Sequence, residues 1–439
     1  MRDILIFAAI FGLIPWMLKR PAIGALVFMW LSIMNPHRLA YGMAHDFPFA
    51  AVVAGITMFS VMISKEPRRF LFTPVTTLLL IFAAWMTLTS CFALSPEIAW
   101  SEWNRVSKTL LMVLITILVI NTERDLKRLV WILGLSLGFY GLKGGLFTIM
   151  SGGSYRVWGP DGSYIGENNA LALALVMTVP ILWYLRLQAE KRWMRHGLEL
   201  LAVLSIVSAA GSYSRGAMLG MGGMLGLLWL KSRHKFGTAL GIALVVPLVF
   251  FAMPDAWTDR MLSVGQYQQD GSALGRINAW KFGIAIASNN IFGGGFLAFN
   301  PTLFRIYAPD PLDFHVAHSI YFQVLGEHGF IGLFLYLSIL FATWRAASGI
   351  IKQCKNDLEL KWMSDLAAMC QVSMVGYMLG GAFLSLAYYD FFYYVIAALV
   401  IMQKILLSRK VPTTPKVFNS VPAHQRRKIA DQPGRANAG

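Results

Sequence analysis

Thirteen apolar runs, most of them close to the length that crosses a bilayer, occupy most of this 439-residue chain. A helix needs about 20 apolar residues to span the hydrocarbon core, and in lipid every backbone polar group must find a partner within the protein. No run alternates apolar and polar residues in the manner of a strand. We therefore predict an all-α polytopic membrane protein with 12 or 13 transmembrane helices. The runs lie at about 4–18, 22–36, 47–64, 73–93, 108–121, 127–149, 169–187, 197–211, 216–231, 236–253, 330–348, 365–387 and 391–407.

Composition supports the same class of protein. Hydrophobic residues make up 56% and charged residues 14% of the chain, whereas soluble domains carry about a quarter charged residues. The formal net charge of +16 does not indicate a nucleic-acid partner, because Lys and Arg lie in short clusters between the apolar runs and in the C-terminal tail. Cys91, Cys354 and Cys370 share no close spacing, which argues against a disulfide framework and a cysteine metal site.

The basic clusters fall in alternate loops, which predicts the orientation of the helices because cytoplasmic loops carry the excess of Lys and Arg. Residues 1–407 form the predicted transmembrane domain, and the basic tail 408–439 is expected to be disordered and cytoplasmic. Loop 254–329 is the largest loop on the opposite, outward side, and we predict that it carries the chemistry. The other outward loops are 37–46, 94–107, 150–168 and 212–215.

Two basic residues of the outward loops each precede a membrane-length run. His318 lies at an expected helix start, and Arg215 lies between Ser214 and Gly216 at another. A guanidinium beside a helix N-terminus joins a charge to free backbone donors, as in phosphate sites. The alternatives are structural: a helix cap for His318, and for Arg215 a cation that extends from the membrane to the interface. The helix after Arg215 carries a predicted close-packing face made of Gly216, Gly220, Gly222, Gly223 and Gly226.

Arg276 lies in a predicted amphipathic helix within loop 254–329. Leu274, Ile277, Trp280 and Ile284 recur at helical spacing, so we expect this face to lie against the membrane surface. Arg276 is then either a ligand for an anion or simply part of the charged face of a surface helix.

Further candidates have weaker signals. Lys143 lies near the outer end of the run 127–149, where an intramembrane charge is a functional candidate. Arg156, Arg260 and Arg305 are expected to widen an electropositive cleft. His315 and His328 are expected to be structural. The sequence has no Asp-x-Asp motif and no glycine-rich phosphate loop, so we expect no metal ion, no other cofactor and no nucleotide-sugar donor.

The spacing around His318 resembles a known signature. His318-Ser319, nine residues, Gly329, two residues and Gly332 match a pattern of the O-antigen ligase and O-antigen polymerase superfamily of bacterial envelope glycosyltransferases. Glu327 falls where that family often has an acid, and Ser319 where it often has Asn. The Ser-Arg-Gly element at Arg215 and the Gly-Arg element at Arg276 resemble the positions of the ligases' two pyrophosphate-binding arginines.

The N-terminal stretches Met34 to Arg38 and Asp46 to Ala50 resemble a narrower subgroup, the probable O-glycosylation ligases associated with exosortase A. This second resemblance leaves the acceptor open, because the subgroup implies that the glycan is attached to a glycoconjugate other than lipopolysaccharide.

The resemblance implies a GT-C-like fold in the bacterial inner membrane, with one large helical periplasmic loop that holds the active site. The donor would be a glycan on undecaprenyl pyrophosphate and the acceptor a sugar hydroxyl of lipid A-core, joined with inversion and without a metal. His318 would be the general base, and Arg215 and Arg276 would bind the donor pyrophosphate. The other candidate substrate contacts are Lys143, Arg156, Arg305, Ser319 and Glu327.

Three alternatives stay open at the level of the sequence. An O-antigen polymerase and a protein O-oligosaccharyltransferase would share the donor chemistry. A lipid-linked glycan transporter would be non-enzymatic, but such a protein is expected to spread charges along its helices, whereas here they concentrate in one outward loop.

Overall fold

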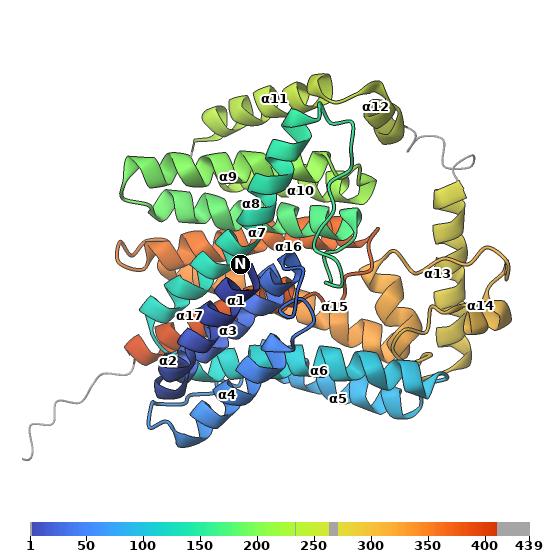
Figure 1. Cartoon of the computed structure of the whole chain (residues 1–439), viewed down its shortest axis with the longest axis horizontal. Coiled ribbons are helices and arrows are strands. Elements are labelled where there is room, and N and C mark those ends of the chain that lie inside the picture. The colour runs from blue at the N-terminus through green and yellow to red at the C-terminus, as the bar shows by residue number, and fades with distance from the viewer. Residues whose placement is uncertain (1, 233, 263–270, 411–439) are drawn as a thin grey trace, which may run out of the picture.

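The structure is a computed structural model that describes residues 2–232, 234–262 and 271–410. Over these residues it contains helices and no strand, which confirms the predicted all-α class (Figure 1). The helices are α1 (Arg2–Gly12), α2 (Ile14–Lys19), α3 (Pro21–Met34), the 3-10 helix η1 (Pro36–Leu39), α4 (Phe49–Ile63), α5 (Pro74–Cys91), α6 (Pro96–Val119), α7 (Glu123–Met150), α8 (Asn168–Gln188), α9 (Arg192–Ala210), α10 (Arg215–Lys231), α11 (Lys235–Ala252), α12 (Asp255–Leu262), α13 (Gly271–Asn289), α14 (Pro301–Tyr307), α15 (Ile320–Cys354), α16 (Lys361–Gly381) and α17 (Asp390–Lys410).

All thirteen apolar runs fall on helices, and the protein is a multi-pass membrane protein. Among the described residues six helices are long and apolar enough to cross a membrane, while α3 and α4 are apolar but shorter; the total of 12 or 13 spans stays a prediction. The first run is divided between α1 and α2 next to Pro15, because proline cannot donate the helical hydrogen bond. The six helices are α5, α7, α8, α11, α15 and α17.

The helices place the two sets of loops at opposite ends. The turns between α8 and α9 and between α15 and α16, together with the end of α17, lie at the left of Figure 1, and α13 and α14 lie at the right. The left-hand turns carry the basic clusters of the sequence. α17 continues to Lys410, past the predicted boundary at 407; tail residues 411–439 lie outside the described residues.

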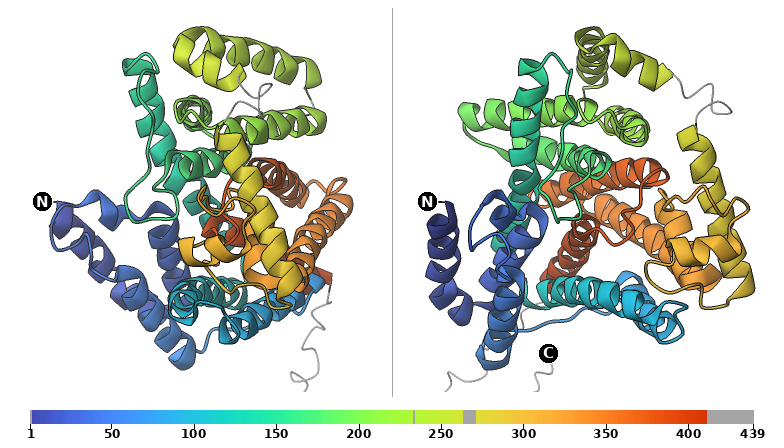
Figure 2. Two further views of the ribbon diagram at one scale, coloured as in Figure 1. Left: turned by 90° about the vertical axis from the view of Figure 1, so that its right-hand side faces the viewer. Right: turned by 45° about the vertical axis from the view of Figure 1, so that its right-hand side comes forward.

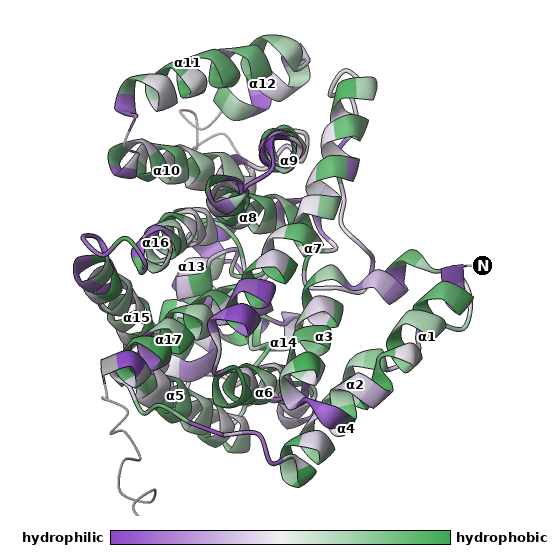
Figure 3. Ribbon diagram, turned by 90° about the vertical axis from the view of Figure 1, so that its left-hand side faces the viewer, coloured by the Kyte–Doolittle hydropathy of each residue, from purple (hydrophilic) through white to green (hydrophobic). Residues whose placement is uncertain are grey.

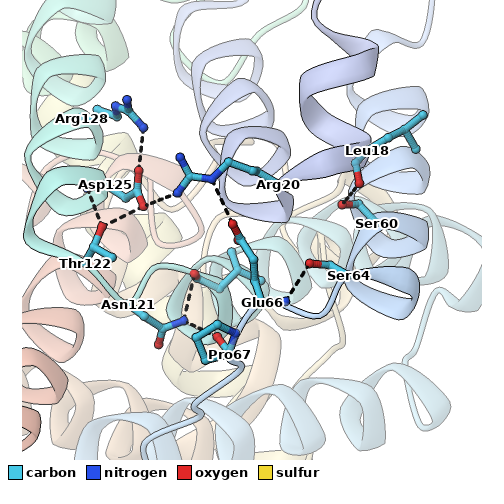
Figure 4. A network of polar contacts seen from close by, with 11 residues as sticks. Leu18, Arg20, Ser60, Ser64, Glu66, Pro67, Asn121, Thr122, Asp125 and Arg128 are labelled. Atoms are coloured by element: carbon cyan, nitrogen blue, oxygen red, sulfur yellow. Dashed lines mark hydrogen bonds and ion pairs between the residues drawn. The ribbon is translucent and has the colours of Figure 1, made fainter.

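A polar network ties the N-terminal helices together at the basic end (Figure 4). Asp125, at the start of α7, accepts hydrogen bonds from Arg20 (3.2 Å), Arg128 (2.7 Å) and Thr122 (2.8 Å). Arg20 also pairs with Glu66 at 3.0 Å, in the loop after α4. Only 3% of Asp125 is exposed, so its charge depends on these partners.

Helices α10 and α16 approach closely through glycines. A Cβ atom on Gly220 would lie 2.7 Å from the Gly376 carbonyl oxygen, and one on Gly216 would lie 2.9 Å from the Phe383 Cβ. The predicted small-residue face is therefore correct for these positions. It is wrong for Gly222 and Gly226, which meet no atom within 4 Å, because these two glycines turn away from α16.

Helix α13 runs across the ends of the other helices (Figures 1 and 2), and the contact of its Leu274 face with the membrane stays a prediction. Leu274 and Ile284 are exposed, whereas Phe282 and Ile286 are fully buried. The helix has apolar residues on both faces, and packing against α14 and α15 buries the face that carries Phe282 and Ile286.

Candidate functional site

His318 lies immediately before α15, in an unusual backbone conformation. Its φ is 42°, a left-handed value that is uncommon for residues other than glycine. Ser319 is the N-cap of α15, and its buried side chain accepts a hydrogen bond from the Phe322 amide at 3.5 Å. The local structure therefore uses Ser319 to begin the helix and turns the backbone at His318 away from the helix axis.

Helix α13 brings Arg276 to His318. One turn after Arg276, the Trp280 indole donates a hydrogen bond to the Ala317 carbonyl at 2.9 Å. The same indole stacks on Phe322 with ring centroids 4.9 Å apart and an interplanar angle of 9°. The contacts to Ala317 and Phe322 hold α13 against the chain just before and just after His318.

The electrostatics of His318 follow from this arrangement. Burial, with further contributions from the positive charges of Arg276 and His315, lowers the pKa of His318 to about 4. A neutral imidazole at pH 7 can accept a proton. An anion held by Arg276 would raise this pKa, because a nearby negative charge stabilises the imidazolium form.

Arg215 begins α10, where the Ser214 side chain caps the helix by accepting a hydrogen bond from the Ala217 amide at 3.3 Å. The next residue, Gly216, packs against Phe383, whose ring lies 6.3 Å from that of Trp280. Phe383 therefore connects the start of α10 to α13. The start of α10 at Arg215 and the start of α15 after His318 therefore lie at the same end of the molecule, near Phe383.

The segment between α16 and α17, residues 382–389, was not predicted from the sequence to be part of the site; it contains Phe383. The available signal was the polar interruption Tyr388-Tyr389-Asp390 between the last two apolar runs. Tyr388 donates a short hydrogen bond to Oε2 of Glu327, and the Ala387 amide donates one to Gln323 at 3.2 Å. This segment thus closes over the first part of α15.

Glu327 is buried, and its carboxylate joins two other segments to α15. Only 2% of it is exposed; its Oε1 accepts the Leu297 amide at 3.1 Å, and its other oxygen is bonded to Tyr388. Two residues later Gly329, with φ 68° and ψ −173°, interrupts α15, a conformation open to glycine. The carboxylate therefore holds the segment after α13 and the segment after α16 against the first part of α15.

The two other histidines of this region have structural partners, as expected. His328 is fully buried, and its Nδ1 lies 2.7 Å from the Thr89 hydroxyl. His315 lies 2.9 Å from the Asp313 carboxylate and packs over Gly275.

Of the four remaining basic candidates, two lie near Arg215. Arg156 is exposed and lies over the Tyr213 ring, 5.8 Å from its centroid, and Arg260 donates to the Tyr213 carbonyl at 3.0 Å. Both therefore lie close to Arg215 in the fold. Lys143 on α7 and Arg305 on α14 are exposed, and no contact given by the structure brings either side chain to His318.

A second polar cluster was not singled out from the sequence. The Arg105 guanidinium lies 3.5 Å from the centroid of the Tyr164 ring, and the Tyr164 hydroxyl donates to Glu102 at 2.9 Å. Its signal was the pair of charges inside the predicted outward loop 94–107, which the structure folds into the first turns of α6. In the parts of the chain that the structure describes, no three His, Cys, Asp or Glu residues are grouped to hold a metal ion.

Fold and site together define a class: a multi-pass helical membrane protein in which Arg276 lies beside His318 at one end of the helices. Residues 200–337 match a family model described as O-Antigen ligase, so the chain carries an O-antigen ligase family domain, which includes Arg215, Arg276 and His318. This match supports a membrane glycosyltransferase of the ligase and polymerase type. Residues 1–190 match a family of unknown function, and no curated protein matches the chain.

Proposed function

We infer that this protein is an O-antigen ligase, which transfers a glycan from undecaprenyl pyrophosphate to a sugar hydroxyl of lipid A-core. The observation that carries the proposal is the docking of α13 on the start of α15, with Trp280 bonded to Ala317, which sets Arg276 beside a neutral His318. A cation for the leaving group and a base for the acceptor are the two groups that this transfer needs.

In the proposed reaction, the acceptor oxygen forms a bond to the anomeric carbon as the bond from that carbon to the pyrophosphate oxygen breaks, with inversion. His318 takes the proton of the acceptor hydroxyl. The electron pair of the broken bond leaves with undecaprenyl pyrophosphate, and Arg215 and Arg276 stabilise its charge with fixed, charge-assisted hydrogen bonds. Since the guanidinium groups supply this stabilisation, the reaction is metal-independent and is expected to continue in excess EDTA.

Arg156 and Arg260 extend the basic surface beside Arg215 and are proposed to contact the donor. Ser319 and Glu327 are proposed to act on the substrate only through the backbone that they hold, since both side chains are buried. Lys143 and Arg305 stay candidates for contacts with more distant sugars of the glycan.

Transfer is tested with the purified full-length protein in nanodiscs, supplied with glycan-linked undecaprenyl pyrophosphate and lipid A-core. The ligase proposal expects glycosylated lipid A-core and release of undecaprenyl pyrophosphate. Lengthening of the donor glycan without lipid A-core would identify a polymerase instead. Glycosylation of a Ser- or Thr-containing acceptor protein, or movement of donor across the bilayer without transfer, would support the oligosaccharyltransferase or the transporter.

The proposed location is the bacterial inner membrane with His318 facing the periplasm. In a Cys91→Ser background, Leu312→Cys and Leu358→Cys place thiols at sites that are 92% and 89% exposed at opposite ends of the helices. An impermeant maleimide should label Leu312→Cys in intact spheroplasts, and Leu358→Cys only after permeabilisation. The reverse pattern would overturn the orientation.

A further inference from the structure

A groove separates α11 from the rest of the bundle, at the end of the helices opposite to His318. It has a volume of about 720 Å³ and is lined by side chains of α8, α9, α10, α11 and α16. α11 is long and apolar enough to cross a membrane, yet none of its residues is buried within the protein. Figure 3 shows the apolar α11 above α10, apart from the helices below it.

The walls of the groove are apolar at membrane depth. Val179 of α8, Ile206 of α9, Leu225 of α10 and Val245 of α11 face it. Water does not fill an apolar cavity, because it needs two or more polar partners there. Hydrocarbon fills such a space with favourable dispersion contacts, so an occupant from the bilayer must present an alkyl chain.

Charged side chains of both signs line the groove near its basic, predicted cytoplasmic end, where α8 and α10 end and α9 and α16 begin. The residues are Arg186, Lys231, Glu199 and Asp365, two basic and two acidic. The Nε atom of Arg186 lies 3.4 Å from Oε2 of Glu199, and the Arg186 guanidinium carbon lies 4.6 Å from the centroid of the Trp183 ring.

Lys231 is held in place from α16. Its ammonium group donates to the Gln371 side chain at 2.6 Å, and Gln371 in turn donates to Ser348 at 2.8 Å. The cations at this end are therefore fixed by neighbouring helices, and carboxylates lie beside them.

We propose that this groove binds one phosphatidylethanolamine molecule of the cytoplasmic leaflet. Its acyl chains fill the apolar part, its phosphate accepts hydrogen bonds from Arg186 and Lys231, and its ammonium donates to Glu199 and Asp365. A charged lining with equal numbers of both signs complements a zwitterionic headgroup better than an anionic one. A primary ammonium has three N–H donors for carboxylates, which a quaternary choline headgroup lacks. The site is distinct from the proposed catalytic end and does not depend on the proposed reaction.

The test uses full-length protein in nanodiscs with equal amounts of phosphatidylethanolamine, phosphatidylglycerol and phosphatidylcholine, plus undecaprenyl phosphate. After transfer to detergent, native mass spectrometry counts the retained lipids. We expect one phosphatidylethanolamine per chain, retained at least about tenfold over the other lipids, which corresponds to about 1.4 kcal/mol. Lys231→Gln should lose the bound lipid. Glu199→Gln should retain phosphatidylglycerol in preference to phosphatidylethanolamine.

Steric filling gives a matched pair of variants. Gly241 lines the groove from α11, and a Cβ atom there would meet no atom within 4 Å, so the side chain added in Gly241→Leu should occupy the groove and displace the lipid. Gly226 on α10 also has open space but does not line the groove, and Gly226→Leu should retain the lipid. Both variants should elute as single symmetric peaks in size-exclusion chromatography and unfold at the temperature of the unsubstituted protein, which would show that they are folded.

Three outcomes would overturn the proposal. Equal retention of all lipids would show a non-specific boundary layer, and preferential retention of undecaprenyl phosphate would assign the groove to a polyprenyl chain. Retention of phosphatidylethanolamine by Gly241→Leu at the level of Gly226→Leu would place the bound lipid elsewhere.

Discussion

The two ends of the helices use charge differently. At the basic end, cations are matched with carboxylates: Arg20 and Arg128 with Asp125, and Arg186 with Glu199. At the opposite end, the positive charges of Arg276 and His315 both act on His318, and His315 also lies 2.9 Å from the Asp313 carboxylate. Matched charges hold helices together, whereas gathered cations raise one another's energy. An anion would be attracted to positive charges placed in this way, and the end that carries His318 is therefore the one proposed for phosphate chemistry.

Replacing the proposed base tests the comparison most severely. His318→Ala should lower the single-turnover rate by roughly 10²- to 10⁴-fold, the usual contribution of general-base catalysis, with donor affinity nearly unchanged. His315→Ala, three residues away and paired with Asp313, is the matched control and should lose much less. If His318→Ala loses donor binding instead, the histidine is a phosphate ligand and another residue is the base.

The arginines should affect binding as well as rate. Arg276→Ala and Arg215→Ala each remove charge-assisted hydrogen bonds of about 1.5–3 kcal/mol, so donor affinity should fall by roughly 10- to 100-fold. Lysine at either position should restore only part of this loss, because an ammonium lacks the bidentate geometry. Arg192→Ala, exposed at the other end of the bundle, should leave donor binding in nanodiscs unchanged. Full rescue by lysine would argue against bidentate recognition.

Asp125→Asn tests the matched charges. The buried carboxylate is bonded to Arg20, Arg128 and Thr122, so its loss should destabilise the protein by about 1.5–3 kcal/mol. Thermal unfolding in detergent, followed by tryptophan fluorescence, measures the change. Asp46→Asn is the control, since Asp46 pairs with Arg38 at 3.0 Å but is 85% exposed; an exposed ion pair contributes about 0–1 kcal/mol. Equal destabilisation by the two variants would refute the structural role of this network.

The pH dependence of kcat/KM is expected to show the smallest change. Protonated His318 cannot accept a proton, so activity should fall as pH falls through the pKa of His318, about 4 in the free protein. Arg276→Gln removes one of the positive charges that lower this pKa, and the acid limb of its residual activity should therefore move to higher pH. Donor binding should move the limb of kcat upward relative to that of kcat/KM. If the acid limb does not move in Arg276→Gln, the charge of Arg276 does not act on the pKa of His318.

Much of the fold could be predicted from local patterns, but the packing around the site could not. The lengths of the apolar runs predicted the helices. The sequence motifs at Arg215, Arg276 and His318 identified residues that lie in the matched domain 200–337. Helix periodicity found the apolar face of α13 with Leu274 and Ile284 but not the buried one with Phe282 and Ile286, because the helix is apolar on both sides and only α14 and α15 decide which side is covered. Phe383 was missed since its contacts to Gly216 and Trp280 join residues more than 100 positions apart.

By itself, the sequence determined an all-helical membrane protein, the alternation of basic loops and the identity of the basic candidate residues, since length, hydropathy and charge act locally along the chain. Only the tertiary structure decided which of these residues meet. Burial of Glu327 under Leu297 and Tyr388, the break of α15 at Gly329 and the placement of Arg276 beside His318 each need segments that are distant in sequence. Desolvation and packing arise from all the neighbours of a group in space, and no window of the chain contains those neighbours.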